Sequence, residues 1–160
     1  SLMFFPASCV IMEGVAGPEY WKRKDAQSLN ARTTRVLVVD DDVEIQQLVR
    51  ILLSRRGIET IAAESAAEAS RILSAPPLPD LLILDLVLPQ VSGMEYLKRL
   101  RATPAFDHLP ILVLSSMVDT ETIRTALNNG ADRYLTKPYI ANNLVSIVQD
   151  MLKTGRLVRS

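Results

Sequence analysis

The chain has 160 residues, of which 18 are basic and 18 are acidic, so its formal net charge is zero. This length predicts one domain with a sizeable core, and the charge balance provides no overall field that would attract nucleic acid or a membrane surface. The single Cys9 excludes an internal disulfide, and the sequence has neither an apolar run long enough for a membrane span nor the basic start of a signal peptide. We therefore expect a cytoplasmic protein that contacts no membrane.

Residues 1–34 differ from the rest of the chain because they show no clear hydrophobic period. We expect them to form a leader or a linker that is partly disordered, and Ser1-Leu2 before Met3 has the form of a cloning remnant. A basic-aromatic cluster at 20–24 is more often solvated than functional, so we assign it no role. Residues 35–153 are regular and form the predicted domain, and residues 154–160 are expected to be a tail or the start of a linker.

The first half of the domain predicts two strands and two helices. Residues 36–39 are an apolar strand that ends in three consecutive acids, and residues 58–63 form a second strand. Between them, apolar residues recur every three or four positions until Gly57 stops the helix (Ile45, Leu48, Val49, Leu52 and Leu53). The sequence Ser65-Ala66-Ala67-Glu68 has the form of a capping box, which opens a helix to about residue 74.

The second half continues the alternation. Residues 81–85 are an apolar run that ends on Asp85 and is bounded by prolines, which favours a buried strand over a buried helix. Ser92 and Glu95 form a second capping-box pattern, and the helix that they open has an apolar stripe (Met94, Leu97 and Leu100). The remaining elements are a strand at 111–114 that ends on Ser115, a helix from Asp119 to Asn129, a strand at 132–136 and a last helix at 139–153.

Five strands that alternate with five helices predict an α/β fold, a doubly wound five-stranded parallel sheet of the flavodoxin-like type. In such sheets ligands bind at the carboxyl ends of the strands. The polar residues that follow four of the five strands therefore share one edge: Asp40 and Asp41, then Asp85, Ser115 and Lys137.

Three clustered carboxylates call for a cation, because two of them about 4 Å apart repel by roughly 1 kcal/mol in water and about 4 kcal/mol at an effective dielectric of 20. Oxygen ligands favour Mg²⁺, with Mn²⁺ as the alternative. A metal ion beside Lys137 and Ser115 would bind the oxygens of a tetrahedral anion, as phosphoryl transfer requires.

Four segments together resemble the signature blocks of the response regulator receiver domain of two-component systems. They are Val38 to Asp42, Leu84 to Gly93, Leu114 to Ser116 and Gly130 to Pro138, in matching order and spacing, and the resemblance covers about residues 35–153. It implies the chemotaxis-type receiver fold with strand order 2-1-3-4-5. It also implies a phosphoprotein that signals in a phosphorelay rather than a conventional enzyme, although it takes part in its own phosphotransfer and slow dephosphorylation.

The resemblance assigns roles to single residues. Asp85 would be the phosphoacceptor, which takes a phosphoryl group from a histidine kinase or a histidine phosphotransfer protein. The implied metal ligands are Asp41, Asp85, the backbone carbonyl of Val87 and Asp40, the last often through water, while Asp42 would cap a helix. The remaining implied residues are Lys137 as the partner of the phosphoryl group, Ser115 as the switch hydroxyl and Tyr134 as the switch aromatic, with a cis bond between Lys137 and Pro138.

Phosphorylation would act through charge, because a dianion replaces a single carboxylate charge and attracts the loop after Ser115. The face built by the helix at 119–129, the strand at 132–136 and the helix at 139–153 would then repack for partner binding or homodimer formation, with a coupling of about 1 to 3 kcal/mol. We expect no direct nucleic-acid binding by this domain. Partner docking is expected on the exposed side of the first helix near Gln46 and Val49, together with the Pro138-Tyr139 turn.

Two other readings stay open. In a phosphatase of the haloacid dehalogenase type, Asp40 would attack and Asp42 would serve as acid and base, but Glu44 stands where a threonine is usual and Asp85 has no role. A degenerate receiver would bind partners without being phosphorylated, and the intact acids, hydroxyl and lysine argue against it.

Overall fold

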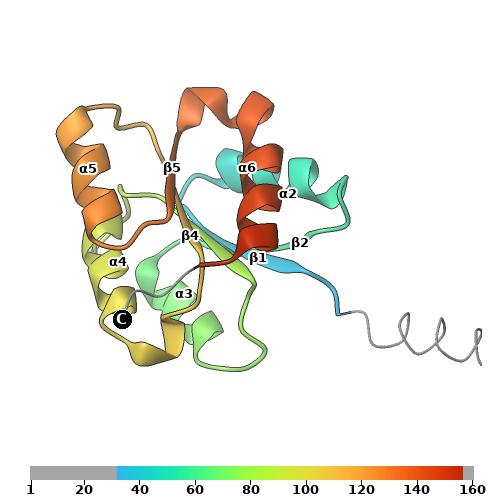
Figure 1. The fold of residues 1–160 in the computed structure, drawn as a ribbon, viewed down its shortest axis with the longest axis horizontal. Helices are drawn as coiled ribbons and strands as arrows, with labels where there is room; N and C mark the ends of the chain where they lie inside the picture. The colour runs from blue at the N-terminus through green and yellow to red at the C-terminus, as the bar shows by residue number, and fades with distance from the viewer. Residues whose placement is uncertain (1–31, 157–160) are drawn as a thin grey trace, which may run out of the picture. The chain divides into compact units, whose positions relative to one another are not determined.

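The computed structural model describes residues 32–156, which contain a five-stranded parallel sheet in the order β2-β1-β3-β4-β5 (Figure 1). The predicted strand order is confirmed. The leader expected at 1–34 and the tail expected at 154–160 lie largely outside the described residues, so their assignments stay predictions.

The elements follow the predicted alternation. The strands are β1 Arg35–Val39, β2 Glu59–Ala63, β3 Leu81–Leu84, β4 Ile111–Ser115 and β5 Arg133–Thr136. The helices are α2 Val43–Ser54, α3 Ala66–Leu73, α4 Gly93–Arg101, α5 Thr120–Asn128 and α6 Ile140–Thr154. Two short 3-10 turns, Pro104–Phe106 and Lys137–Tyr139, precede β4 and α6 respectively. Within residues 32–156, no helix combines the length and the hydrophobicity that a membrane crossing requires.

Four of the five helices within residues 32–156 begin with a capping side chain. The side chains of Asp42, Ser65, Ser92 and Asp119 each accept a hydrogen bond from a backbone amide in the first turn. The two expected capping boxes are only half formed. Glu68 accepts from the amide of Glu64 rather than from Ser65, and Glu95 pairs with Arg99, one helical turn further on.

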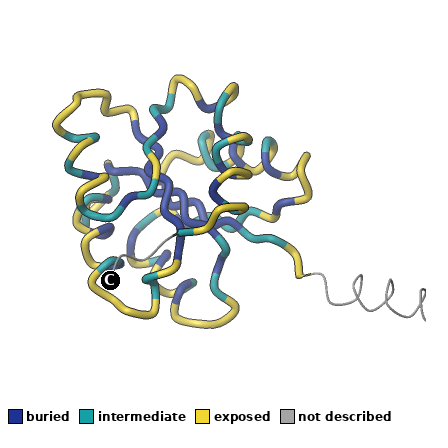
Figure 2. Tube along the Cα trace, in the orientation of Figure 1, coloured by how far each residue is buried: buried dark blue, intermediate teal, exposed yellow. Residues whose placement is uncertain are grey.

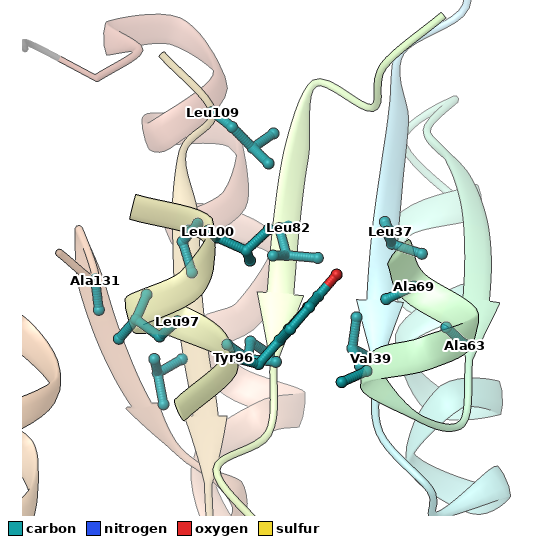
Figure 3. Close-up of a cluster of buried hydrophobic side chains, with 14 of the residues drawn as sticks. Leu37, Val39, Ala63, Ala69, Leu82, Tyr96, Leu97, Leu100, Leu109 and Ala131 are labelled. Carbon is teal, nitrogen blue, oxygen red and sulfur yellow. The ribbon is translucent and has the colours of Figure 1, made fainter. Parts of the chain in front are cut away.

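The sheet is covered on both faces: β3 and β4 are buried along their whole length and β1 is buried from Val36 onward, whereas the edge strands β2 and β5 are partly exposed (Figure 2). Leu37 and Val39 of β1 point into one core, which α3, α4 and α5 cover, while Val36 and Val38 point into the other, which α2 and α6 cover. Figure 3 shows the first core, in which Tyr96 of α4 lies between the sheet and α3. The Tyr96 hydroxyl reaches Ser70 of α3 at 3.0 Å.

Candidate functional site

The site lies where β1 and β3 end side by side. The amide of Asp40 bonds to the carbonyl of Ala63 on β2, and the amide of Asp85 bonds to the carbonyl of Val39, both at 3.0 Å. The ladder therefore continues one residue beyond each strand and brings the Asp40 and Asp85 side chains to the same edge. Both residues are almost completely buried, with 1% and 4% of their surface exposed.

One ammonium group joins the two carboxylates. Lys137, the first residue after β5, places its Nζ 2.9 Å from Asp40 Oδ2 and 3.0 Å from Asp85 Oδ2. The three groups come from three different strands, and the sequence prediction that Asp40, Asp85 and Lys137 meet is correct in this geometry. Two buried acids and one cation leave the site with a formal excess of negative charge.

Burial and pairing shift the pKa values of two of these groups. Burial raises the pKa of Asp40 above its usual range, and the neighbouring charge of Asp85 raises it further, against the lowering effects of the Asp42 amide and of Lys137. Burial alone would lower the pKa of Lys137, but hydrogen bonds and charge from Asp40 and Asp85 outweigh it, so the net pKa is raised. The carboxylates therefore hold the lysine in its charged form.

The donor set fits a hard divalent cation. Asp40, Asp41 and Asp85 each offer a carboxylate oxygen, and these three atoms lie within 4.8 Å of one another. Asp40 Oδ1 accepts from the Asp42 amide at 2.9 Å, whereas the buried Oδ2 receives no well-directed hydrogen bond despite its ion pair with Lys137. Asp42 instead turns its side chain to the Glu44 amide at 2.9 Å, so it caps α2 as predicted and does not join the cluster.

The loop that follows Asp85 is held tightly against the next helix. The Val87 amide donates to Asp85 Oδ1 at 3.2 Å, and the Val87 side chain is exposed. Gly93, at the start of α4, donates its amide to the Leu86 carbonyl at 2.8 Å. A Cβ at position 93 would lie 1.9 Å from the Asp85 carbonyl oxygen, so only glycine permits this approach. That the Val87 carbonyl binds a cation stays a prediction.

Ser115 and Tyr134 are linked through the loop after β4. The Ser115 hydroxyl is fully buried and accepts from the Met117 amide at 3.3 Å, while the Tyr134 hydroxyl donates to the Met117 carbonyl at 2.7 Å. Burial raises the pKa of Tyr134, which favours the protonated donor. Both predicted switch residues therefore contact the same residue of one loop.

Two expectations are wrong, of which the first was derived from the resemblance. The Lys137–Pro138 bond is trans, because residues 137–139 already form a 3-10 turn in which proline takes an opening position; within residues 32–156 the one cis bond joins Pro76 to Pro77. Val49 has no exposed surface and packs in the core beneath α2, so it cannot offer a docking contact. Tyr139, by contrast, is exposed as expected.

Two residues that matter to the site were missed. Gln46 of α2 donates its side-chain amide to the Asp40 carbonyl at 2.6 Å and so fixes the turn that carries the acids. Gly93 was read as part of a helix start, and its close approach to Asp85 was not anticipated. The contact of Gln46 could be anticipated only weakly, from a polar residue six positions after Asp40 on the helix that leaves the site. Nothing in the local sequence indicates the close approach of Gly93 to Asp85.

Comparison with known proteins agrees with this geometry. Residues 36–149 match the family described as the response regulator receiver domain. The chain is 32% identical over 119 residues to the phosphate regulon transcriptional regulatory protein PhoB of Escherichia coli strain K12. The alignment covers 74% of this chain and 52% of PhoB. It is 42% identical over 106 residues to the transcriptional regulatory protein KdpE of Mycobacterium tuberculosis, which covers 66% of this chain and 45% of KdpE. The chain thus spans about half the length of these curated relatives.

Solved structures show the same fold. The receiver domain of the Francisella response regulator 1452 superposes with a TM-score of 0.69 at 31% identity, covering 76% of this chain and 98% of that one. The chemotaxis response regulator CheY4 of Vibrio cholerae superposes with a TM-score of 0.68 at 28% identity, covering 74% and 98%.

Proposed function

The chain belongs to the response regulator receiver domain family of two-component signalling, which consists of signalling domains rather than conventional enzymes, and we propose that Asp85 is its phosphoacceptor. The acidic pocket of Asp40, Asp41 and Asp85 is consistent with such a site. A receiver of this kind implies a cognate histidine kinase, and in our proposal the phosphoryl group comes from that kinase or from a histidine phosphotransfer protein.

The observation that carries the proposal is the position of Asp85. Its carboxylate is buried at the end of the central strand β3, one oxygen accepts from Lys137, and the other accepts from the Val87 amide. An attacking carboxylate needs a neighbouring cationic group that can neutralise the charge of the incoming phosphoryl group. Lys137 is the group within reach in this cluster, and we assign it that role.

The cation completes the neutralisation. Asp40, Asp41, Asp85 and the Val87 carbonyl are the ligands that we propose for Mg²⁺, with Mn²⁺ as the alternative. When bound, the ion would supply charge neutralisation at the phosphoryl oxygens and orient the donor. The burial of Asp40 and Asp85 supports this assignment, because the single charge of Lys137 cannot neutralise both buried acids and a further cation would stabilise the charge that remains.

The switch that we propose runs through Met117. Ser115 would turn its hydroxyl from the Met117 amide toward the phosphoryl oxygens, which removes one of the contacts that hold the loop after β4. Tyr134 holds the same residue through its carbonyl, so a shift of the loop would move or release the aromatic side chain. The α5–β5–α6 face would then change for partner binding or dimerisation. We further propose that a partner docks in the cytoplasm on the exposed Tyr139 turn together with the outer side of α2 near Gln46.

The phosphatase reading has less support. Asp42, which would serve as acid and base in that reaction, points its side chain at the Glu44 amide of its own helix. Asp40, which would attack, is held by an ion pair with Lys137 and by its contact with the Asp42 amide. Asp85, which forms an ion pair with Lys137 just as Asp40 does, would have no function in that reaction.

The test is the intact mass of the protein after incubation with Mg²⁺ and acetyl phosphate, beside Asp85→Asn. We expect a hydroxylamine-labile phosphoryl adduct on the wild type alone, because an acyl phosphate is cleaved by hydroxylamine. Omission of Mg²⁺ with a chelator should abolish the adduct. An adduct that persists in Asp85→Asn would refute the assignment and point to Asp40, and the absence of any adduct even with a competent histidine phosphotransfer protein would favour the degenerate receiver.

A further inference from the structure

A second cluster of charges lies at the opposite end of the sheet, where β4 and β5 begin. Asp132 directly precedes β5, and its Oδ2 accepts from the amide of Ile111, the first residue of β4, at 2.8 Å. Two arginines bind the same carboxylate: Arg101 Nη2 lies 2.9 Å from Oδ2, and Arg156 Nε lies 3.0 Å from Oδ1. A single carboxylate is therefore shared between the last residue of α4 and the segment that follows α6.

Arg101 also holds the end of α5. Its Nε donates to the Gly130 carbonyl, directly after α5, and its Nη1 donates to the Phe106 carbonyl, both at 2.9 Å. Gly130 has a φ of +108°, and a Cβ there would lie 2.5 Å from Arg101 Cγ, so the glycine allows the arginine to pass close to the chain. The guanidinium thus connects the α5 end to Asp132.

Arg156 fastens the chain after α6 at this edge. Besides Asp132, its Nη1 donates to the Asp107 carbonyl at 2.7 Å, and four-fifths of its side-chain surface is covered, with 20% exposed. α6 lies on the face of the sheet opposite to α4 and α5 (Figure 1). Arg156, which follows α6, therefore connects that side of the sheet to Asp132 and Asp107, which lie near the ends of α5 and α4. The cluster borders an open hollow of about 990 Å³, so solvent can reach the contacts when they break.

We infer that Arg101, Asp132 and Arg156 form a latch that couples the end of α5 to the segment Gly155-Arg156 after α6. The two guanidiniums bind different oxygens of one carboxylate, so each helps to hold Asp132 in the position that the other needs. If α5 shifts and draws Arg101 away from Asp132, the carboxylate is held less firmly, and Arg156 loses part of its anchor.

The charges agree with such mutual dependence. Burial, and then the nearby charge of Arg156, lower the pKa of Arg101 to about 10, and Asp132 and Asp107 oppose this shift. The two cations therefore repel each other while they share an anion. Asp132 offsets this repulsion at both guanidiniums, and Arg156 in turn helps to hold Asp132 in place. Removal of Arg156 should therefore loosen the hold of Asp132 on Arg101.

Hydrogen–deuterium exchange of the full chain tests the coupling without any phosphorylation. The reporters are the amides of Asn129, Gly130 and Ala131, which bond to carbonyls of the last turn of α5. In Arg156→Gln these amides should exchange about fivefold faster, as expected for the loss of a partly buried charged hydrogen bond. Lys153→Gln removes the same charge from an exposed position in the last turn of α6 and should leave them unchanged.

Three results would overturn the latch. A change confined to residues 154–156 would mean that Arg156 is held without coupling to α5, and no change at all would mean that it is not held. Equal acceleration in α5 and in the β3 core would show general destabilisation instead of a specific link.

A second experiment, which rests on the proposed function, asks whether the latch responds to phosphorylation. Trypsin cleaves after Arg156 only when the guanidinium is free, so we expect cleavage to become about fivefold faster once acetyl phosphate and Mg²⁺ have modified the protein. Cleavage after Lys153 in the same digest is the internal control. Unchanged cleavage at Arg156 in protein whose mass shows the adduct would refute the response. If no adduct forms with acetyl phosphate or with a competent histidine phosphotransfer protein, the proposed function fails, and the exchange measurement still decides the latch.

Discussion

Replacement of Lys137 by methionine should destabilise the protein strongly in the absence of divalent cations. The ammonium lies within 3.0 Å of an oxygen of both Asp40 and Asp85, and both carboxylates are nearly inaccessible to solvent. Loss of one partner from a buried ion pair costs about 3 to 5 kcal/mol. Because the lysine side chain is 18% exposed and the site faces solvent, we expect about 2 to 4 kcal/mol for Lys137→Met.

The cation dependence distinguishes this cause from lost packing. The site oxygens lie within 4.8 Å of one another, a separation at which two unit charges repel by about 3.5 kcal/mol at an effective dielectric of 20. Mg²⁺ at a hundred times its dissociation constant adds about 2.7 kcal/mol to the stability of the folded state. Saturating Mg²⁺ should therefore restore most of the stability that Lys137→Met loses.

The assay is urea unfolding, followed by far-ultraviolet circular dichroism, with EDTA and with Mg²⁺. Lys153→Met is the matched control, because that lysine is exposed on α6, and its replacement should change the stability by less than about 0.5 kcal/mol under either condition. If Lys137→Met were as stable as the wild type in EDTA, or lost stability that Mg²⁺ did not restore, repulsion between the two acids would not be the cause.

Two further predictions concern the same edge of the sheet. Gly93→Ala should lower the free energy of unfolding by about 1 to 3 kcal/mol and slow adduct formation, because the new Cβ would collide with the Asp85 backbone. The control is Gly57→Ala, whose Cβ meets nothing within 4 Å at a φ of +73°; it should cost about 1 kcal/mol through backbone strain and leave phosphorylation intact. Equal phosphorylation rates in the two variants would contradict the role of Gly93. Asp40→Asn should be more stable than the wild type by about 1 kcal/mol at neutral pH in EDTA. Burial raises the pKa of Asp40, so the native state binds more protons than the unfolded state, and wild-type stability falls as pH rises from the unfolded value of 3.8 through the native one. Unfolding curves from pH 4 to 7 should therefore diverge with rising pH, and parallel curves would exclude this charge as the cause.

The fold was predictable because its signals are local and repeated. Apolar runs that end in Asp40 and Asp85 mark buried strands, and parallel strands bring their carboxyl ends to one edge. The meeting of these acids with Lys137 followed from topology alone. The contact of Gln46 with the Asp40 carbonyl did not, since it depends on how α2 leaves its cap, and no spacing rule specifies a rotamer.

Other features were out of reach because they depend on tertiary packing. The pairing of Arg156 with Asp132 joins residues 24 positions apart through the end of α6, and charged residues near a predicted tail carry no sign of a partner. The expected docking at Val49 failed for a related reason: the same three-residue spacing that predicts the helix places Val49 on its buried face. The expected cis bond at Lys137 was transferred from a resemblance, and the local 3-10 turn requires none.

The charges of the site suggest why a receiver of this geometry would switch. Asp40, Asp41 and Asp85 carry a formal charge of minus three, which Lys137 reduces to minus two and a divalent cation reduces to zero. A phosphoryl group on Asp85 would replace one negative charge by about two, so Lys137 would have to leave its shared position between the acids. Lys137 begins the 3-10 turn that leads into α6, while Ser115 and Tyr134 hold the loop that leads into α5. The added charge would therefore be relieved by movements at the carboxyl ends of β4 and β5, which would account for a response on the α5–β5–α6 face without any direct contact between that face and the phosphoryl group.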